Sequence, residues 1–355
     1  MDYISDRLTV NRMNHYEIFT DAGRGLFAQR LEEICQRVGD YLEAEHRQHR
    51  TLGYTKVFLS DISNQEELLR QSPLMTRHLS QAACTIIQQS PIGGAKIGLL
   101  LKTTDEPEAF TMHSLRLTDD EVMNFGSYMQ TIMLFDKYLA LLEAQGLSLK
   151  EHCVRTWIYV RDIDTNYDGV VKARNDVFRQ HGLTTATHFI ASTGIGGRAM
   201  GKNVCVAIDF LTAPGVRPQD ILYLKALDHL NPTHEYGVAF ERGVRITLPQ
   251  KYEYFISGTA SINCHGEVIN VGDVTRQAER LLENIGALLA DGGATMNDVK
   301  YFIIYLRDLA DADAIETYMQ QAFPNVPHII THAKVCRPAW LVEMECIAEK
   351  GRESE

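Results

Sequence analysis

Hydrophobic and polar positions along the chain alternate in helical and strand patterns. The same order of helices and strands occurs three times. The clearest helical pattern covers residues 275–290, where apolar side chains recur every three or four positions and form one apolar face. Such a face must be buried, and the apolar runs that follow predict the strands of a partner sheet. The third repeat therefore predicts helix 275–290, strand 300–306, helix 312–321 and strands 328–335 and 340–347.

The same order of elements precedes this repeat twice. Because glycine and proline favour turns, we interpret residues 91–94 and the glycine-rich residues 193–197 as turns between the last two strands of each earlier repeat. Residues 215–272 depart from the repeat and contain strands 244–248 and 252–258, an opening hairpin that the first two repeats lack in clear form. The remaining predictions are helix 26–45, strand 56–59, helix 66–79, strands 84–88 and 96–101, helix 128–143, strand 154–160, helix 170–179, and strands 188–192 and 204–210.

Three repeats predict an α+β fold of three tandem lobes, each a sheet with helices on one face. The expected boundaries are 1–110, 111–232 and 233–350, the first lobe being the most degraded copy. In each repeat the long apolar strand is followed by an aspartate just before a helix, and we interpret Asp61, Asp162 and Asp308 as N-caps.

Composition and charge narrow the class of protein. Of 355 residues, 45% are hydrophobic and 23% charged, as in a globular protein, and no apolar run approaches the roughly 20 residues of a membrane span. The first residues do not resemble a signal peptide, so we expect a cytoplasmic protein whose seven cysteines are small buried hydrophobes without disulfides or structural zinc. A net charge of −11 argues against binding to nucleic acid.

The third repeat resembles the Rid (YjgF-type) superfamily over nearly its whole length. The resemblance implies a chorismate-mutase-like fold and, for three copies in one chain, an intramolecular pseudo-trimer with sites between lobes, either monomeric or weakly self-associating. Imine-hydrolysing members carry a Pro-x-Arg element and an SGQ element; here the corresponding stretches read Pro327-His328-Ile329 and Ser257-Gly258-Thr259. Other matching stretches are Phe255-Ile256-Ser257-Gly258, Gly272-Asp273-Val274-Thr275-Arg276-Gln277, Asn284, Gly292-Gly293-Ala294 and Val342-Glu343-Met344-Glu345-Cys346.

The second and third repeats together resemble the chorismatases, which hydrolyse the enolpyruvyl ether of chorismate. Residues before about Pro107 carry little of this resemblance. The matching stretches are residues 154–160, Asp168-Gly169 and the Arg174 region, 192–196, 234–237, 255–262, 272–274, Cys336-Arg337 and 341–345.

This resemblance implies a carboxylic acid that protonates an enol ether without a metal or organic cofactor, in a cleft between the second and third lobes. Glu343 matches the acid of the chorismatase C-terminal strand, and Glu345 lies on the same face of that strand because side chains alternate. A substrate with carboxylates requires cations, and arginine pairs with a carboxylate bidentately. The expected substrate-binding residues are Arg155, Arg307, Arg337, Tyr159, Tyr236, Gly194, Gly196 and Thr259.

Structural interpretations of the same residues stay open. Arg155 lies mid-strand, where either a bound anion or an internal acid such as Asp162 or Glu343 must compensate its charge. The two glutamates are equally consistent with a pairing across lobes, and the tyrosines with packing. The alternatives to a chorismatase-like enzyme are a Rid-like protein that binds or deaminates a small carboxylate-bearing metabolite, and a non-catalytic scaffold of the same fold.

Overall fold

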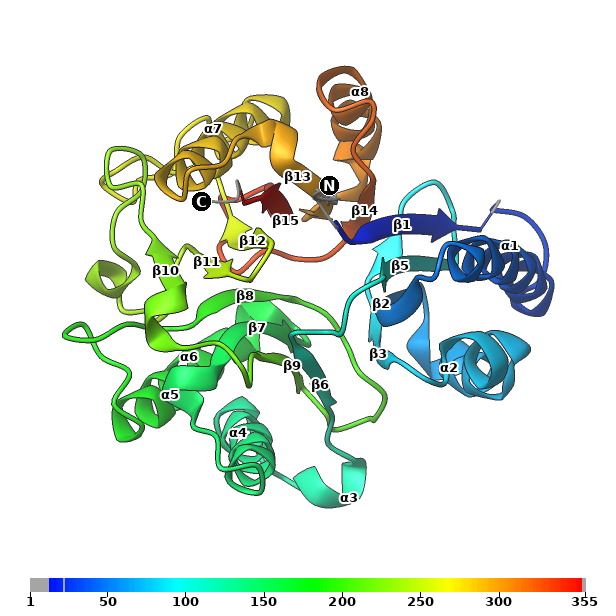
Figure 1. Ribbon diagram of the computed structural model, residues 1–355, viewed down its shortest axis with the longest axis horizontal. Helices are drawn as coiled ribbons and strands as arrows, with labels where there is room; N and C mark the ends of the chain where they lie inside the picture. The colour runs from blue at the N-terminus through cyan, green and yellow to red at the C-terminus, as the bar shows by residue number, and fades with distance from the viewer. Residues whose placement is uncertain (1–12, 22, 353–355) are drawn as a thin grey trace, which may run out of the picture.

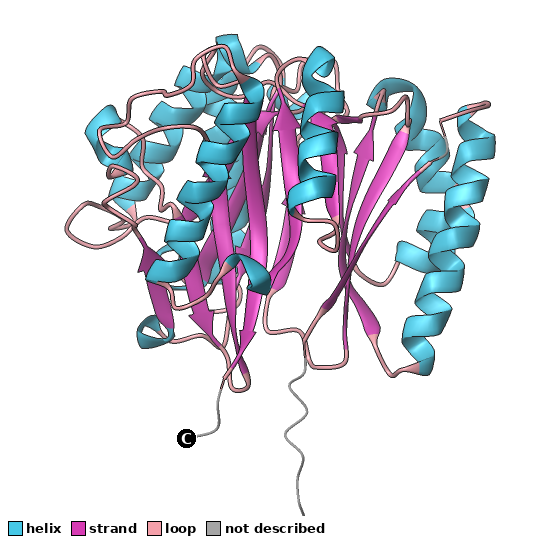
Figure 2. Cartoon of the chain, turned by 90° about the horizontal axis from the view of Figure 1, so that it is seen from above, coloured by secondary structure: helices cyan, strands magenta, loops and turns pink. Residues whose placement is uncertain are grey.

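The computed structural model describes residues 13–352 apart from residue 22, and these residues form three lobes around a common centre (Figure 1). Each lobe has a β-sheet that faces the centre and helices that cover its outer face. Figure 2 shows the strands gathered in the middle of the molecule with the helices around them. The predicted α+β fold of three tandem lobes is confirmed.

Lobe 1 has the strand order β1-β5-β2-β3, with β2 and β3 parallel. The hairpin predicted from strands 84–88 and 96–101 is wrong, because β3 and β5 pair with opposite edges of β2. The returning strand β5 pairs antiparallel with the edge of β2 that β3 leaves free, and β3 stays at the edge of the sheet. The elements are β1 (His15–Thr20), α1 (Phe27–Arg47), β2 (Thr51–Leu59), α2 (Ile62–Gln71), η1 (Leu74–Leu79), β3 (Ala83–Gln88), β4 (Ser90–Pro91) and β5 (Ile97–Thr104).

Lobe 2 repeats this topology as β6-β9-β7-β8. Residues 193–197 were predicted as a turn between two strands, but residues 193–196 belong to β8 itself, which pairs in parallel with β7. β9 pairs with the other edge of β7, so here too no hairpin forms. The elements are β6 (Thr111–Leu115), α3 (Asp119–Val122), α4 (Ser127–Glu143), α5 (Leu149–His152), β7 (Cys153–Val160), α6 (Ile163–Gln180), β8 (Ala191–Gly196) and β9 (Val206–Thr212).

Lobe 3 has a seven-stranded sheet, ordered β10-β11-β12-β15-β13-β14-β4. The predicted hairpin is confirmed as β11 and β12, whereas β10 joins this sheet ahead of the boundary predicted at residue 233. β4, which belongs to the chain of lobe 1, pairs with β14 and links the two lobes. The elements are η2 (Pro218–Asp220), β10 (Ile221–Leu224), η3 (Thr233–Tyr236), β11 (Gly243–Thr247), β12 (Lys251–Thr259), α7 (Val274–Asp291), η4 (Met296–Asp298), β13 (Val299–Leu306), η5 (Leu309–Asp311), α8 (Ala312–Ala322), β14 (His328–His332) and β15 (Val342–Gly351).

The three aspartates at the ends of the central strands differ in what they bind. Asp308 caps η5 by accepting a hydrogen bond from the backbone amide of Ala310 at 2.9 Å, as predicted. Asp61 and Asp162 stand at N-cap positions without a side-chain cap bond. Asp162 has a φ of 48°, far from the extended conformation from which a cap side chain reaches the first-turn amides.

The cysteines were expected to be buried without disulfides, and no segment was expected to span a membrane. All seven cysteines are free thiols, but only Cys153 and Cys346 are fully buried, so the reading of all seven as small buried hydrophobes holds for these two alone. Among the described residues, no helix combines the length and apolar character that crossing a bilayer requires.

Candidate active site

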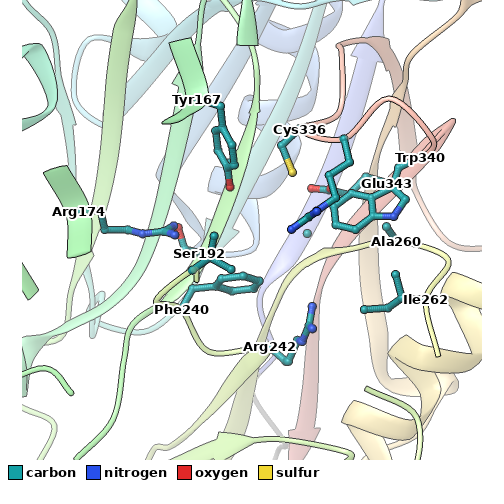
Figure 3. Close-up of a pocket in the computed structure, with 14 residues that line it drawn as sticks. Tyr167, Arg174, Ser192, Phe240, Arg242, Ala260, Ile262, Cys336, Trp340 and Glu343 are labelled. Carbon is teal, nitrogen blue, oxygen red and sulfur yellow. The ribbon is translucent and has the colours of Figure 1, made fainter. Parts of the chain in front are cut away.

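A cavity of about 40 Å³ lies between lobes 2 and 3, where the sequence places a cleft (Figure 3). Its wall is built from α6 and β8 of lobe 2 and from β12, β15 and three connecting segments of lobe 3. One acid and three arginines therefore meet beside aromatic and apolar side chains. The lining residues are Tyr167, Arg174, Ser192, Gly194, Val238, Phe240, Arg242, Gly258, Ala260, Ile262, Cys336, Arg337, Trp340 and Glu343.

Glu343 is the acid of this cavity. It lies on β15 opposite Tyr305 of β13, and only 4% of its surface is exposed to solvent. Burial raises its pKa to about 8, the charge of Glu345 adds to the rise, and Arg155 and Arg242 oppose it. No hydrogen bond or ion pair to Glu343 is formed within the described part of the chain. A carboxyl group in this state is protonated at neutral pH and has a proton to donate.

Glu345, the predicted partner acid, lies behind the cavity and not on its wall. Its Oε2 accepts a hydrogen bond from Arg155 Nη2 at 2.9 Å and another from the Thr193 hydroxyl, and its Oε1 accepts from Trp157 Nε1 at 2.7 Å. The buried charge of Arg155 is therefore compensated by an internal carboxylate. That carboxylate is Glu345, and neither Asp162 nor Glu343. We conclude that Glu345 and Arg155 form a buried ion pair beneath the acid.

The arginines that line the cavity are Arg174, Arg242 and Arg337, of which only Arg337 was expected as a ligand. Arg174 and Arg242 are 1% and 6% exposed, and their guanidinium carbons lie 5.8 and 5.4 Å from the ring centre of Phe240. Arg242 donates to the backbone oxygen of Asn231 at 3.0 Å. Planar guanidinium groups on three separate elements suit a ligand that carries carboxylates.

A sequence signal for Arg174 was available. The buried positions of α6 recur at helical spacing, and Arg174 stands on this stripe beside Ala173 and Val177. A charge on an apolar stripe is costly unless it is compensated, so this position pointed to an internal partner or a ligand. Arg242 offers no comparable signal, because it follows an irregular segment that departs from the repeat.

Three other predicted ligand residues lie away from the cavity. Arg307 donates to Asp164 at 2.8 Å and to the backbone oxygen of Val335 at 2.7 Å. The fully buried Tyr159 donates to Asp209 at 3.2 Å, and the Thr259 hydroxyl donates to the backbone oxygen of Ser257. Arg307 binds Asp164 across the interface between lobes 3 and 2, whereas Tyr159 and Thr259 bind partners within their own lobes, so none of the three side chains lines the cavity.

Of the remaining residues predicted to bind substrate, one lines the cavity wall and one lies outside it. Gly194 lines the cavity, where a Cβ atom would lie 2.9 Å from the ring of Tyr167. Gly196 lies outside it, against the backbone of Lys334. Tyr236 ends η3, and its side chain lies outside the described residues. In the described ranges, no group of three or more His, Cys, Asp and Glu side chains is arranged to hold a metal.

The strand register identifies the positions in lobes 1 and 2 that correspond to Glu343. Glu343 pairs with Tyr305 one residue before the end of β13, and the matching positions in the other lobes are Ala207, paired with Tyr159, and Gly98, paired with Phe58. A Cβ atom on Gly98 would lie 2.7 Å from Ile329, so the interface between lobes 1 and 3 is closed there. Only lobe 3 places a carboxyl group at this position.

Comparison with known proteins agrees with this architecture. The family model described as endoribonuclease L-PSP matches residues 248–350. The 3-aminoacrylate deaminase RutC of Acinetobacter baylyi is 30% identical over 95 residues, 27% of this chain and 72% of the relative. A RutC family protein of Pyrococcus abyssi is 35% identical over 99 residues, 27% of this chain and 77% of the relative.

A solved chorismatase structure covers 95% of this chain and 98% of its own, with a TM-score of 0.67 and 19% identity, which establishes a shared fold across all three lobes. The sequence matches to the RutC proteins reach more than two thirds of each relative's length. The chain therefore belongs to the Rid (YjgF, L-PSP) family.

Proposed function

We propose that the protein protonates the enolpyruvyl ether of chorismate, or of a similar small carboxylate, and releases pyruvate. The observation that carries the proposal is a buried Glu343 beside three arginines in one interlobe cavity, where burial raises the pKa of its carboxyl group. The whole-chain likeness in fold to a chorismatase supports it. The acid and the cations match the two needs of such a substrate, a proton donor and partners for carboxylates.

In the proposed reaction, the Glu343 carboxyl proton adds to the methylene carbon of the enol ether. The resulting oxocarbenium ion takes up water, and one proton of that water returns to the Glu343 carboxylate as the hemiketal forms. The hemiketal then breaks into pyruvate and the ring alcohol, and its hydroxyl proton, the second proton of the added water, passes to the ring oxygen. Arg174, Arg242 and Arg337 hold the carboxylates of the substrate, and the Arg155–Glu345 pair supports the acid from below.

The cavity leaves little room for such a substrate. A neighbouring hollow of about 150 Å³ shares Phe240 and Arg242 with it, so these two side chains stand between the two spaces. Both belong to the segment before β11. We infer that this segment shifts on substrate entry and joins the two spaces.

The test of the proposal is pyruvate release from chorismate by the purified protein, measured with lactate dehydrogenase and NADH. Enzyme-dependent, stoichiometric pyruvate formation would support the proposal. No pyruvate at high enzyme concentration and long incubation would exclude this reaction.

The rate should depend on pH through Glu343. Because the protonated form is the reactive one and burial raises its pKa to about 8, kcat should hold a plateau below pH 8 and fall by about tenfold per pH unit above it. Quenched samples assayed for pyruvate at a common pH give this profile. A rate that rises through pH 8 would contradict the acid role.

A single methyl group at Gly258 should disturb the acid. A Cβ atom there would overlap Glu343 Oε1 and lie 2.9 Å from its Cδ, so the carboxyl group must move within a buried site. We expect Gly258→Ala to lower kcat by roughly ten- to a hundredfold, since small displacements of catalytic groups are costly. Gly215→Ala, where a Cβ atom meets nothing within 4 Å, is the matched control in the same pyruvate assay.

Imine deamination is the second candidate, because RutC of Acinetobacter baylyi is named as a 3-aminoacrylate deaminase. The arginine of the Pro-x-Arg element is replaced here by Ile329, which is buried against lobe 1. Ammonia release from a freshly generated imino acid, without pyruvate release from chorismate, would favour this candidate over the first.

A further inference from the structure

A lysine of lobe 1 occupies the centre of the molecule, where the three lobes meet. Lys56 lies on β2 and is 0% exposed. Its Nζ lies 3.7 Å from the ring centre of Trp157 and 3.3 Å from the hydroxyl of Tyr159, both on β7 of lobe 2. Within the described residues it forms no ion pair, which is unusual for a buried cation.

The charge of Lys56 is compensated by an aromatic ring and by acids that it does not contact directly. A cation over an indole face is attracted by the electron-rich ring, and the attraction is stronger when the cation is desolvated. Burial lowers the pKa of Lys56 to about 8, and the charges of Glu345 and Asp209 oppose that fall, whereas Arg155 and Arg116 add to it. These four are the charged groups that act on Lys56 from the surrounding strands and from the segment after β6.

The indole under Lys56 is the one that binds Glu345. Trp157 presents its face to Lys56 and donates through Nε1 to Glu345 Oε1 at 2.7 Å. Glu345 in turn lies two residues from Glu343 on the same face of β15, and its charge contributes to the protonated state of that acid. A series of contacts thus runs from Lys56 of lobe 1 through Trp157 of lobe 2 to Glu345 of lobe 3, which acts on Glu343 through its charge.

We propose that Lys56 is a positioning residue of the active site, which holds the Trp157 indole in the orientation that fixes Glu345 beneath Glu343. This inference rests on the proposed function for its catalytic consequence, but its geometric part does not depend on any substrate. It also gives lobe 1, which contributes no residue to the cavity wall, a direct part in the site.

The proposal can be tested by replacing Lys56 with methionine, which keeps the length of the side chain and removes its charge. The chain has two tryptophans, so [¹⁵N]tryptophan labelling gives two indole resonances, and Trp340→Phe assigns them. We expect Lys56→Met to shift the Trp157 indole resonance, to lower kcat by roughly tenfold with little change in KM, and to move the alkaline limb of kcat to lower pH as Glu345 leaves its place.

Lys102→Met is the matched control, since Lys102 is also a buried lysine of lobe 1 but pairs with Glu108 at 2.8 Å. It should lower the melting temperature and leave the Trp157 resonance and the pH profile unchanged. If Lys56→Met does not fold, Lys56→Gln serves in its place. An unchanged Trp157 resonance together with an unchanged alkaline limb would overturn the proposal.

The indole resonance and the pyruvate assay test the role of Lys56 and the proposed function independently of each other. The indole resonance is measured without substrate, so it decides on the role of Lys56 even if the wild-type protein releases no pyruvate. Absence of wild-type turnover would count against the proposed function alone.

Discussion

Glu343→Gln is expected to lower kcat for pyruvate release by about 10²- to 10⁴-fold, the usual effect of losing a general acid. Glutamine keeps the shape of the side chain, so ligand affinity should change little. The substitution also removes a carboxyl group whose pKa is raised by burial, and therefore a group whose ionisation opposes folding as the pH rises from its ordinary pKa of about 4.5 to about 8. The variant should be at least as stable as the wild type at pH 8.

Three measurements on the variant separate catalysis from structure: kcat in the pyruvate assay, ligand affinity by calorimetry, and melting temperature. Asp311→Asn is a matched control, because burial also raises the pKa of Asp311 but it lies in η5, away from the cavity. An inactive Glu343→Gln that also fails to bind ligand would assign Glu343 to binding. An active variant would remove it from the mechanism.

Arg155→Met is expected to cost about 3–5 kcal/mol in the free energy of unfolding, because it leaves Glu345 as an uncompensated buried charge. Arg155 and Glu345 are 1% and 3% exposed, and the pair joins β7 of lobe 2 to β15 of lobe 3. Replacing both partners, as in Arg155→Met with Glu345→Leu, should recover most of this loss, since apolar side chains of similar volume need no counter-charge.

Chemical denaturation measures this effect as a shift of the transition midpoint, compared between variants whose transition slopes agree. Arg217→Met is the surface control: Arg217 also pairs with an acid, Asp220, but it is exposed, and we expect the transition midpoint to change little. A single Arg155 variant as stable as the wild type would show that the central pair does not hold the lobes together.

The three lobes share one topology but not one chemistry. At the matching strand position, lobe 3 carries Glu343, lobe 2 carries Ala207 and lobe 1 carries Gly98. The interface that would correspond to a second site is packed by Ile329. The repeat therefore serves the fold, while the proposed chemistry is confined to one of its interfaces.

The sequence by itself determined the repeat, the α+β class and the strand that bears the acid. These features depend on local periodicity, because a period of two fixes which strand residues share a face and a period near 3.6 fixes the apolar face of a helix. They placed Glu343 and Glu345 on one face of β15, while the expectation of a site between lobes 2 and 3 came from the family resemblance, and a cavity lies there. The same local patterns read residues 193–197 as a turn although residues 193–196 lie in β8, and they predicted a hairpin across the turn at residues 91–94 although its flanking strands do not pair, because a glycine-rich stretch does not reveal which strands pair.

Only the tertiary structure decided which charged groups are paired and which line the cavity. Arg155 and Glu345 are 190 residues apart in the chain and meet only when lobes 2 and 3 close on each other. When these lobes pack together, Arg307 also pairs with Asp164, and Arg242 becomes part of the cavity wall. Periodicity fixes the direction of a side chain relative to its own element, but the partner it meets depends on the packing of distant elements, and no local pattern encodes that.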